Sequence, residues 1–211
     1  MTVILSMKRI IPLLWLTLSA CAPFSEALNR ESPRLYVLTS DHSNKPALPA
    51  EGPVLLVSPP KAWPGYDTAR IAYVKENPRL DYYAKNEWAD HPARMIEPLL
   101  VKALEASGRF NAVVSVGVGI PAQLRLDTEI IHLRQTFLTN PSQGQLAIRA
   151  QLIDLAQQRV LGTQTFNATV PAATDDPSGG VTALHQALDQ VLDAIVAFST
   201  RLTSENIHAS R

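Results

Sequence analysis

The sequence of 211 residues contains a single cysteine, Cys21. One cysteine cannot form a disulfide within the chain, so the fold has to rely on its hydrophobic core. The residues that follow Cys21 therefore lack a cysteine that could act as a nucleophile or bind a metal ion. Cysteine-dependent hydrolases and thiolate metal centres are excluded for this part of the chain.

A surplus of charge of either sign is also missing. When Lys8 and Arg9 are assigned to an N-terminal signal, the rest of the chain carries 17 basic and 19 acidic residues. Binding to nucleic acid needs a basic footprint, and binding to an anionic membrane surface through charge needs a polybasic segment. This near-balance argues against both kinds of partner.

The usual catalytic motifs are absent. No serine stands in a G-x-S-x-G sequence, and the glycines of "GVGIPA" lack the spacing of a dinucleotide-binding loop. The histidines do not have the spacing of a zinc site, and lie far apart: His42, His91, His132, His185 and His208. We expect His132 to be solvated, because it lies beside Arg134 on the polar side of its predicted strand. The sequence thus predicts no catalytic residue, no metal and no cofactor.

The N-terminal segment decides where the chain works. Starting at Met7, "MKRIIPLLWLTLSAC" has a basic start, a short apolar run and small residues before Cys21. The run is shorter than the roughly 20 residues that span a bilayer, but it suits a signal peptide. Cysteine directly after "LSA" matches the bacterial lipoprotein pattern, which implies that Cys21 is lipidated and becomes the first mature residue. Because Ala22 follows it rather than Asp, sorting to the outer membrane is expected in enteric-type bacteria.

The rest of the chain is long enough for one domain with a sizeable core. We predict four segments: a lipoprotein signal peptide over 1–20, the lipidated cysteine with a flexible tether over 21–33, an α/β domain over 34–204, and a tail over 205–211.

Hydrophobic patterns predict the elements of this domain. Strands are expected at Arg34 to Thr39, at Val54 to Pro59 (buried on both faces), and in a hairpin formed by "RIAYV" and "RLDYY"; "PKAWPGYDTAR" between them is expected to be irregular. A helix follows, beginning either with Asp90 as N-cap or later with Pro98 in its first turn, and ending at Gly108. After a strand at "NAVVSVGV", the alternation from Leu124 changes phase near Ile130 and Ile131, which predicts a β-bulge.

Two further strands, "QLAIRAQLIDL" and "RVLGTQTFNATV", complete an antiparallel meander. A long helix over about Pro177 to Leu202 then has one apolar stripe, with Asp189 and Asp193 among the residues that face away from it. The predicted fold is a single α+β domain, in which two helices pack on one face of a largely antiparallel, mixed sheet.

The sequence resembles the ABC-type transport auxiliary lipoprotein family of the paraquat-inducible protein C type. The resemblance lies in the lipoprotein motif, the "YVL" and "VLLVSPP" strands and then the run "RIAYVKENPRLDYYAKNEWADHPARMIEPLLVKALEASGRFNAVV". The C-terminal "GGVTALHQALDQVLDAIVAF" is also similar. The resemblance implies a non-enzymatic accessory lipoprotein that works with an MCE-domain (mammalian cell entry) protein and the permease and ATPase of an ABC transporter. Such systems move phospholipid or other hydrophobic molecules across the periplasm, and the resemblance also suggests that the lipoprotein forms a homo-oligomeric ring.

The stretch "NPRLDYYAKNEWADHP" is the candidate site. We predict that Leu80 and one of Tyr82 and Tyr83 point into the core, whereas the other tyrosine and Trp88 dock a partner. Packing of all these aromatics in the fold is an equal alternative.

Three other readings stay open. Asp81, Glu87, Asp90 and His91 could bind a metal; Asp81 and Glu87 could be the acid–base pair of a lipid-anchored hydrolase; and the chain could be a chaperone or plug for another outer-membrane assembly.

Overall fold

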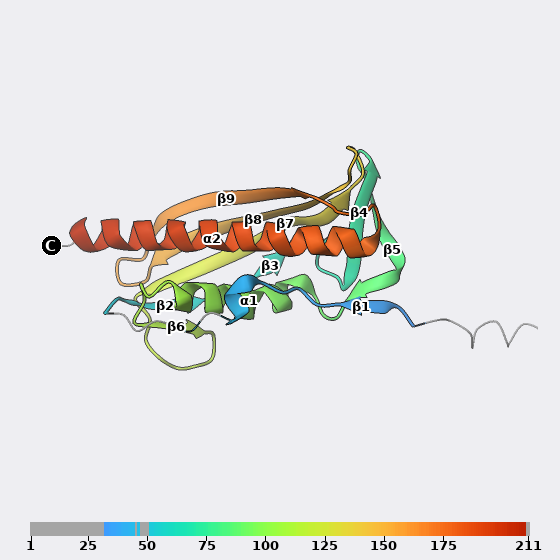
Figure 1. Cartoon of the computed structure of the whole chain (residues 1–211). Helices are drawn as coiled ribbons and strands as arrows, with labels where there is room; N and C mark the ends of the chain where they lie inside the picture. The colour runs from blue at the N-terminus through green and yellow to red at the C-terminus, as the bar shows by residue number, and fades with distance from the viewer. Residues whose placement is uncertain (1–31, 45, 47–50, 210–211) are drawn as a thin grey trace, which may run out of the picture. The chain divides into compact units, whose positions relative to one another are not determined.

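The computed structural model describes residues 32–44, 46 and 51–209, and Cys21 lies outside them. Residues from Pro33 onward form one compact unit, shown in Figure 1. Its elements are β1 (Arg34–Tyr36), the 3-10 helix η1 (Asp41–Asn44), β2 (Val54–Val57), β3 (Lys61–Ala62), β4 (Arg70–Glu76), β5 (Arg79–Trp88), α1 (Pro92–Ala106), β6 (Ala112–Ser115), β7 (Leu124–Thr136), β8 (Gln143–Asp154), β9 (Arg159–Pro171) and α2 (Pro177–Ala209). Within these residues, no helix is both long and apolar enough to cross a membrane.

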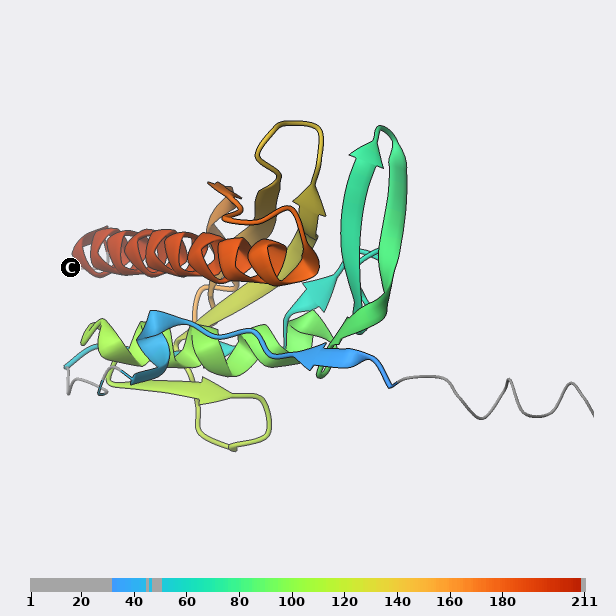
Figure 2. The ribbon, with the colours of Figure 1, turned by 45° about the vertical axis from the view of Figure 1, so that its right-hand side comes forward.

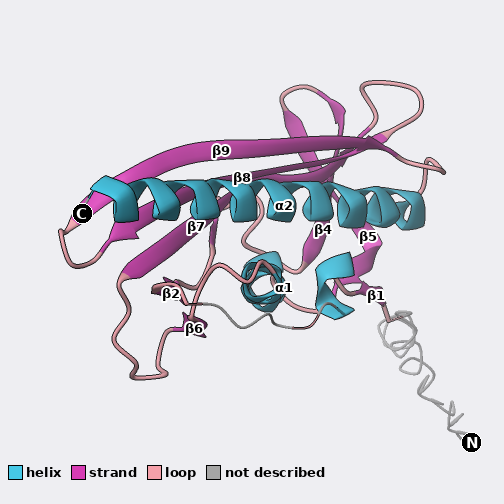
Figure 3. Cartoon of the chain, turned by 60° about the vertical axis from the view of Figure 1, so that its left-hand side comes forward, coloured by secondary structure: helices cyan, strands magenta, loops and turns pink. Residues whose placement is uncertain are grey.

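The strands form one mixed sheet built around β7. Along one edge of β7 lie β2, β3 and β4, each parallel to it, while the other edge carries the antiparallel β8 and then β9. The sheet continues from β2 to β6 and from β4 through β5 to β1. Both helices pack on the same side of this sheet, as Figure 3 shows. The predicted α+β class is therefore confirmed, and the long pairings are the antiparallel ones.

The β-bulge predicted in the long strand is present. In the pairing of β7 with β8 the register shifts between Ile130 and His132, so that Ile131 is the extra residue. Before the shift, Leu126 and Ile130 face the helices, and after it Leu133 does. The bulge lets one strand of 13 residues keep its apolar side chains on the core face along its whole length.

The first helix begins early and continues through its proline. Pro92 occupies the first turn, and the carboxylate of Asp90 accepts a hydrogen bond from the N–H of His91 at 2.7 Å. Pro98 lies inside the helix, where its missing N–H leaves the carbonyl four residues earlier without a helical donor. Gly108 follows the helix with φ of 61°, a conformation that favours glycine.

The second helix has the expected buried stripe and extends beyond Leu202. Asp176 caps it by accepting a hydrogen bond from the N–H of Gly179 at 2.8 Å. The last turns are fixed because Asn206 donates to Asp154 at 2.8 Å and accepts from Arg159 at 2.6 Å. All members of the predicted stripe are buried: Val181, Leu184, Leu188, Val191, Leu192, Ile195, Phe198 and Leu202.

The remaining differences from the predictions are local. The first strand ends at Tyr36 rather than Thr39, and Lys61–Ala62 in the segment expected to be irregular forms the short β3. In β2, buried residues alternate with half-buried ones, so one face of this strand is only partly covered. Its side chains therefore do not show the burial on both faces that the continuous apolar run predicts.

Candidate functional site

The residues predicted to dock a partner lie on β5, the second strand of the β4–β5 hairpin, which Figure 2 shows from its edge. Neighbouring side chains of a strand point to opposite faces, so Tyr82 and Tyr83 are separated by the sheet. Tyr83 packs against the main core, and Leu80 shares the face of Tyr82. The prediction that Leu80 faces the main core was wrong, because Leu80 and Tyr82 lie against Gly65 on the outer face of the hairpin.

Tyr82 is held on this outer face. Its hydroxyl donates a hydrogen bond to the carbonyl of Gly65 at 2.9 Å. The guanidinium of Arg70 lies over its ring, 4.1 Å from the ring centre, in a cation–π contact. The ring is half-buried. Tyr82 and Arg70 together therefore place a fixed aromatic ring and a positive charge next to each other near the surface.

Tyr83 takes part in a polar network on the helix side of the sheet. Its hydroxyl donates to the side-chain oxygen of Gln135 at 2.8 Å, and the amide of Gln135 donates to the hydroxyl of Ser142 at 2.8 Å. The ring of Tyr73 packs beside Tyr83, with 4.6 Å between ring centres. Burial raises the pKa of the Tyr83 phenol far above its ordinary value, and neighbouring Tyr73 and Asp176 add to this shift. Tyr83 is thus a hydrogen-bond donor at every physiological pH.

Trp88 lies in the core. Its side chain is 2% exposed, and its backbone pairs with Tyr36 of β1 and donates to the carbonyl of Ala69 at 2.7 Å. Docking through this ring would require it to leave the core. Among the three predicted docking residues, only the two tyrosines carry side-chain surface in this structure.

The acidic residues of the stretch are dispersed. Asp81 pairs with Arg79 at 3.0 Å, Asp90 with Arg94 at 3.4 Å, and His91 with Asp67 at 3.2 Å. Within the ranges that the structure describes, no group of three His, Cys, Asp or Glu side chains is placed to hold a metal ion. The metal set of Asp81, Glu87, Asp90 and His91 is therefore not assembled.

The two carboxylates of the hydrolase hypothesis lie in different surroundings. Asp81 lies opposite Tyr73 of β4 and forms an ion pair with Arg79. Glu87 lies opposite Arg70 of β4 on one side of β5 and beside Leu35 of β1 on the other.

The segment that leads from β1 to η1 is bound to α2, which the sequence did not reveal. The carboxylate of Asp189 accepts hydrogen bonds from the hydroxyl of Ser40 at 2.5 Å and the N–H of Asp41 at 3.0 Å. His42, which is buried, pairs with Asp193 at 3.0 Å. The two aspartates face away from the main core as predicted, and their spacing of four residues was the only available signal that they share a partner.

His132 is not solvated, contrary to the prediction. It is half-buried on the outer face of β7, where burial, and secondly the charge of Arg134, lower its pKa to about 4. Burial also raises the pKa of the Tyr66 phenol. The charge and the hydrogen bond of Arg134 lower this pKa, but by less than burial raises it. The polar side of this strand is therefore a second, covered layer.

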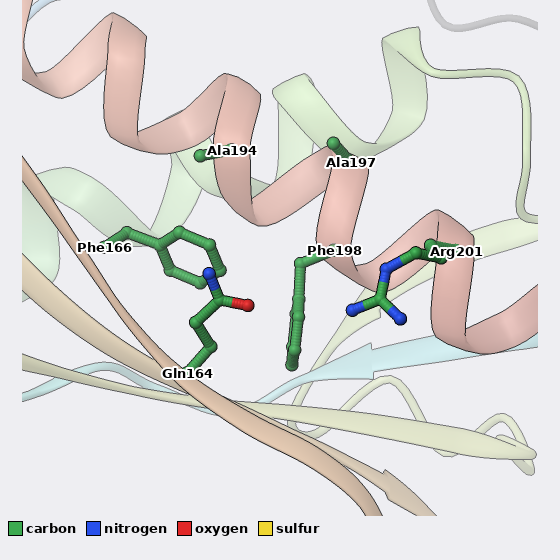
Figure 4. Close-up of a pocket in the computed structure, with 6 residues that line it drawn as sticks. All are labelled: Gln164, Phe166, Ala194, Ala197, Phe198 and Arg201. Carbon is green, nitrogen blue, oxygen red and sulfur yellow. The ribbon is translucent and has the colours of Figure 1, made fainter.

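A depression of about 360 Å³ lies between β9 and α2 (Figure 4). Two aromatic rings form part of its wall, with 5.5 Å between the ring centres of Phe166 and Phe198. Arg201 at its rim pairs with Glu205 at 3.0 Å. The lining residues are Gln164, Phe166, Ala194, Ala197, Phe198 and Arg201, which include no nucleophile and no acid–base pair.

Comparison with known proteins identifies the family of this chain. Residues 36–196 match the family model described as ABC-type transport auxiliary lipoprotein component. The crystal structure of protein XCC0632 from Xanthomonas campestris, assigned to the family model DUF330, is 25% identical, with a TM-score of 0.74 over 82% of this chain and 98% of that chain.

A hypothetical protein, CT253 from Chlamydia trachomatis, shares the fold at 12% identity, with a TM-score of 0.54 over 72% of this chain and 98% of that chain. A comparison with curated proteins finds no match.

Proposed function

Because the chain belongs to the ABC-type transport auxiliary lipoprotein family, we propose that it is the non-enzymatic accessory lipoprotein of an MCE-type ABC transport system. Such a system moves phospholipid or other hydrophobic molecules between the membranes of the cell envelope. The observation that carries this proposal is the family match, which spans most of the folded domain. The dispersed and ion-paired acidic residues of β5 and its neighbours support a role in binding rather than catalysis.

The proposed role places the domain at a membrane through Cys21. Signal residues 1–20 would be removed, residues 21–33 would form the lipidated tether, and the domain over 34–204 with its tail over 205–211 would work on the periplasmic side, at the outer membrane. A tether of about a dozen residues reaches at most about 40 Å. Two or more acyl chains hold a protein stably, because each buried methylene contributes about 0.8 kcal/mol.

The anchor is tested by Cys21→Ser. We expect the serine variant to carry no lipid and to keep its signal segment, whereas Ser19→Ala, a matched change beside the processing site, leaves lipidation and processing unchanged. A serine variant that is processed and stays with the membrane would refute lipidation at Cys21.

The proposed partners are an MCE-domain protein and the permease and ATPase of the transporter, with a homo-oligomeric ring as the form that docks. The exposed edge of Tyr82, together with Arg70, is the better docking surface, because aromatic and arginine side chains dominate interface energies. Tyr83 and Trp88 remain proposed contacts only if the hairpin rearranges.

A photo-crosslinking aromatic residue placed at Tyr82 should capture the MCE-domain protein in membranes, and the same residue at Thr165, which is exposed on β9, should not. Capture of a different outer-membrane assembly at Tyr82 would favour the chaperone or plug reading instead. The double variant Asp81→Asn, Glu87→Gln should leave transport unchanged, and loss of a measurable turnover in that variant with the fold intact would support the hydrolase reading.

A further inference from the structure

The loop between β6 and β7, residues 116–123, is the most apolar exposed feature of the domain. Three aliphatic side chains stand at alternate positions: Val116 is 60% exposed, Val118 54% and Ile120 50%. Pro121 and Ala122 follow, so residues 116–122 include no polar side chain. Surface aliphatic residues occur singly on most proteins, whereas three in one loop mark a contact site.

Space is open around the two glycines in the middle of this loop. Gly117 and Gly119 alternate with the aliphatic residues and have positive φ values of 100° and 74°. A side chain added at either glycine would meet no atom within 4 Å. The far end is fixed instead, because Gln123 donates its N–H to the carbonyl of Val54 at 3.1 Å and accepts from the N–H of Val54 at 2.7 Å. The loop therefore has a firm base at Gln123 and carries three aliphatic side chains that are each at least half exposed.

The loop lies in the lower half of the domain in three views, to the left of β1. Figures 1, 2 and 3 are turned about one vertical axis, and in all three the loop hangs below β6 and β1 lies in the lower half. The turn between β7 and β8 lies at the top in the same views. The first residues of the domain add two exposed aliphatic side chains, Leu35 at 64% and Val37 at 54%.

We infer that the residue 116–122 loop inserts its aliphatic side chains into the lipid bilayer that holds the protein, as a second membrane contact. This rests on the proposed function, since a lipidated Cys21 keeps the domain within reach of a bilayer. Protein interfaces are enriched in aromatic and arginine side chains and carry hydrogen bonds, none of which this loop can supply through its side chains. A bilayer interior requires only apolar surface, and the stretch from Asn111 to Leu124 contains no charged residue that would resist entry.

The test uses the full lipidated protein with Val118→Cys, labelled with an environment-sensitive fluorophore. Cys21 is the only other cysteine and its sulfur would carry lipid, so the label goes to one position. The matched control is Leu138→Cys, an aliphatic residue that is 47% exposed in the β7–β8 turn on the opposite side. Both proteins are floated with vesicles of phosphatidylethanolamine and phosphatidylglycerol, with and without bromine on the acyl chains, and circular dichroism checks the fold.

The inference predicts a blue shift and quenching by brominated chains for the label at position 118, and neither for the label at position 138. Protein that floats while the label at position 118 stays in water, like that at position 138, overturns the inference and leaves the anchor intact. A label at position 118 that is already shielded without vesicles, increasingly so at higher protein concentration, assigns the loop to a protein contact and overturns it as well. Protein that does not float refutes the lipid anchor, and the inference falls with it.

Discussion

Replacing Tyr83 by phenylalanine separates a structural role of this residue from a docking role. The ring and its contact with Tyr73 remain, but the oxygen of Gln135 loses its donor. Gln135 is 1% exposed, and a buried polar atom without a partner costs about 1 to 3 kcal/mol. Because Tyr83 itself is half-buried and water can enter from its side, we expect about 1 to 2 kcal/mol.

Urea unfolding followed by circular dichroism measures this loss, which corresponds to a fall in melting temperature of about 2 to 8 °C for a domain of this size. In Gln135→Met the acceptor is absent, so the additional change Tyr83→Phe should cost less than about 0.5 kcal/mol. A coupling energy near zero between the two positions would refute the hydrogen bond as a source of stability. Recovery of the transporter partner should be unchanged in Tyr83→Phe if its role is structural.

Three further changes test other parts of the fold. The pKa of His132 is about 4 in the folded protein and about 6.5 in the unfolded chain, so the unfolded chain binds the proton first and stability falls as the pH drops from 6.5 to 4. Between pH 7 and pH 4.5, the free energy of unfolding of His132→Gln should therefore fall by about 2 kcal/mol less than that of the wild type. Equal falls would contradict burial of this ring. Trp88→Ala should cost about 3 to 5 kcal/mol in urea unfolding, and a cost below about 1 kcal/mol would mean that the ring is not in the core. Gly144→Ala should cost about 1 to 3 kcal/mol, since its added carbon would lie 2.8 Å from the backbone nitrogen of Leu184, and an unchanged melting temperature would contradict this close approach of β8 and α2.

Features that depend on neighbouring residues in the sequence could be predicted. The stripe of α2 recurs at helical spacing, and the phase change at Ile130 and Ile131 shows directly where the bulge lies. The hairpin of β4 and β5 could be predicted for the same reason, since two alternating runs flank one short turn. These signals reflect which side chains share a face, and that is decided locally.

Features that depend on which element covers another could not be predicted. Gly65 lies against Leu80 and Tyr82 of β5, and Tyr66 interacts with Arg134 of β7, so the chain after β3 contacts the outer face of the sheet. His132 on the same strand is half-buried for a reason that its own neighbours in the sequence do not show. The sequence also does not predict that β2, β3 and β4 pair one after another with the same edge of β7. Likewise, the binding of Ser40 by Asp189 joins residues 149 positions apart.

The sequence predicts which segment carries the aromatic residues of the candidate site, but not which of their side chains face the core. An aromatic-rich strand is visible in the sequence, but alternation alone cannot tell whether Tyr82 or Tyr83 faces the core. Trp88 ends β5 beside β1, and its ring belongs to the main core, which the sequence pattern of the strand did not indicate. Both tyrosines keep side-chain surface, and Tyr82, which bonds to Gly65, is the one that does not pack against the main core.

The proteins that the lipidated chain binds in its own membrane decide its function. Affinity purification from detergent-solubilised membranes, with the Cys21→Ser chain as control, measures this directly. We predict that the lipidated chain recovers an MCE-domain protein together with an ABC permease and ATPase, and that the control recovers far less of all three. Recovery of a different outer-membrane assembly, with no MCE-domain protein above the control, would contradict the proposed function.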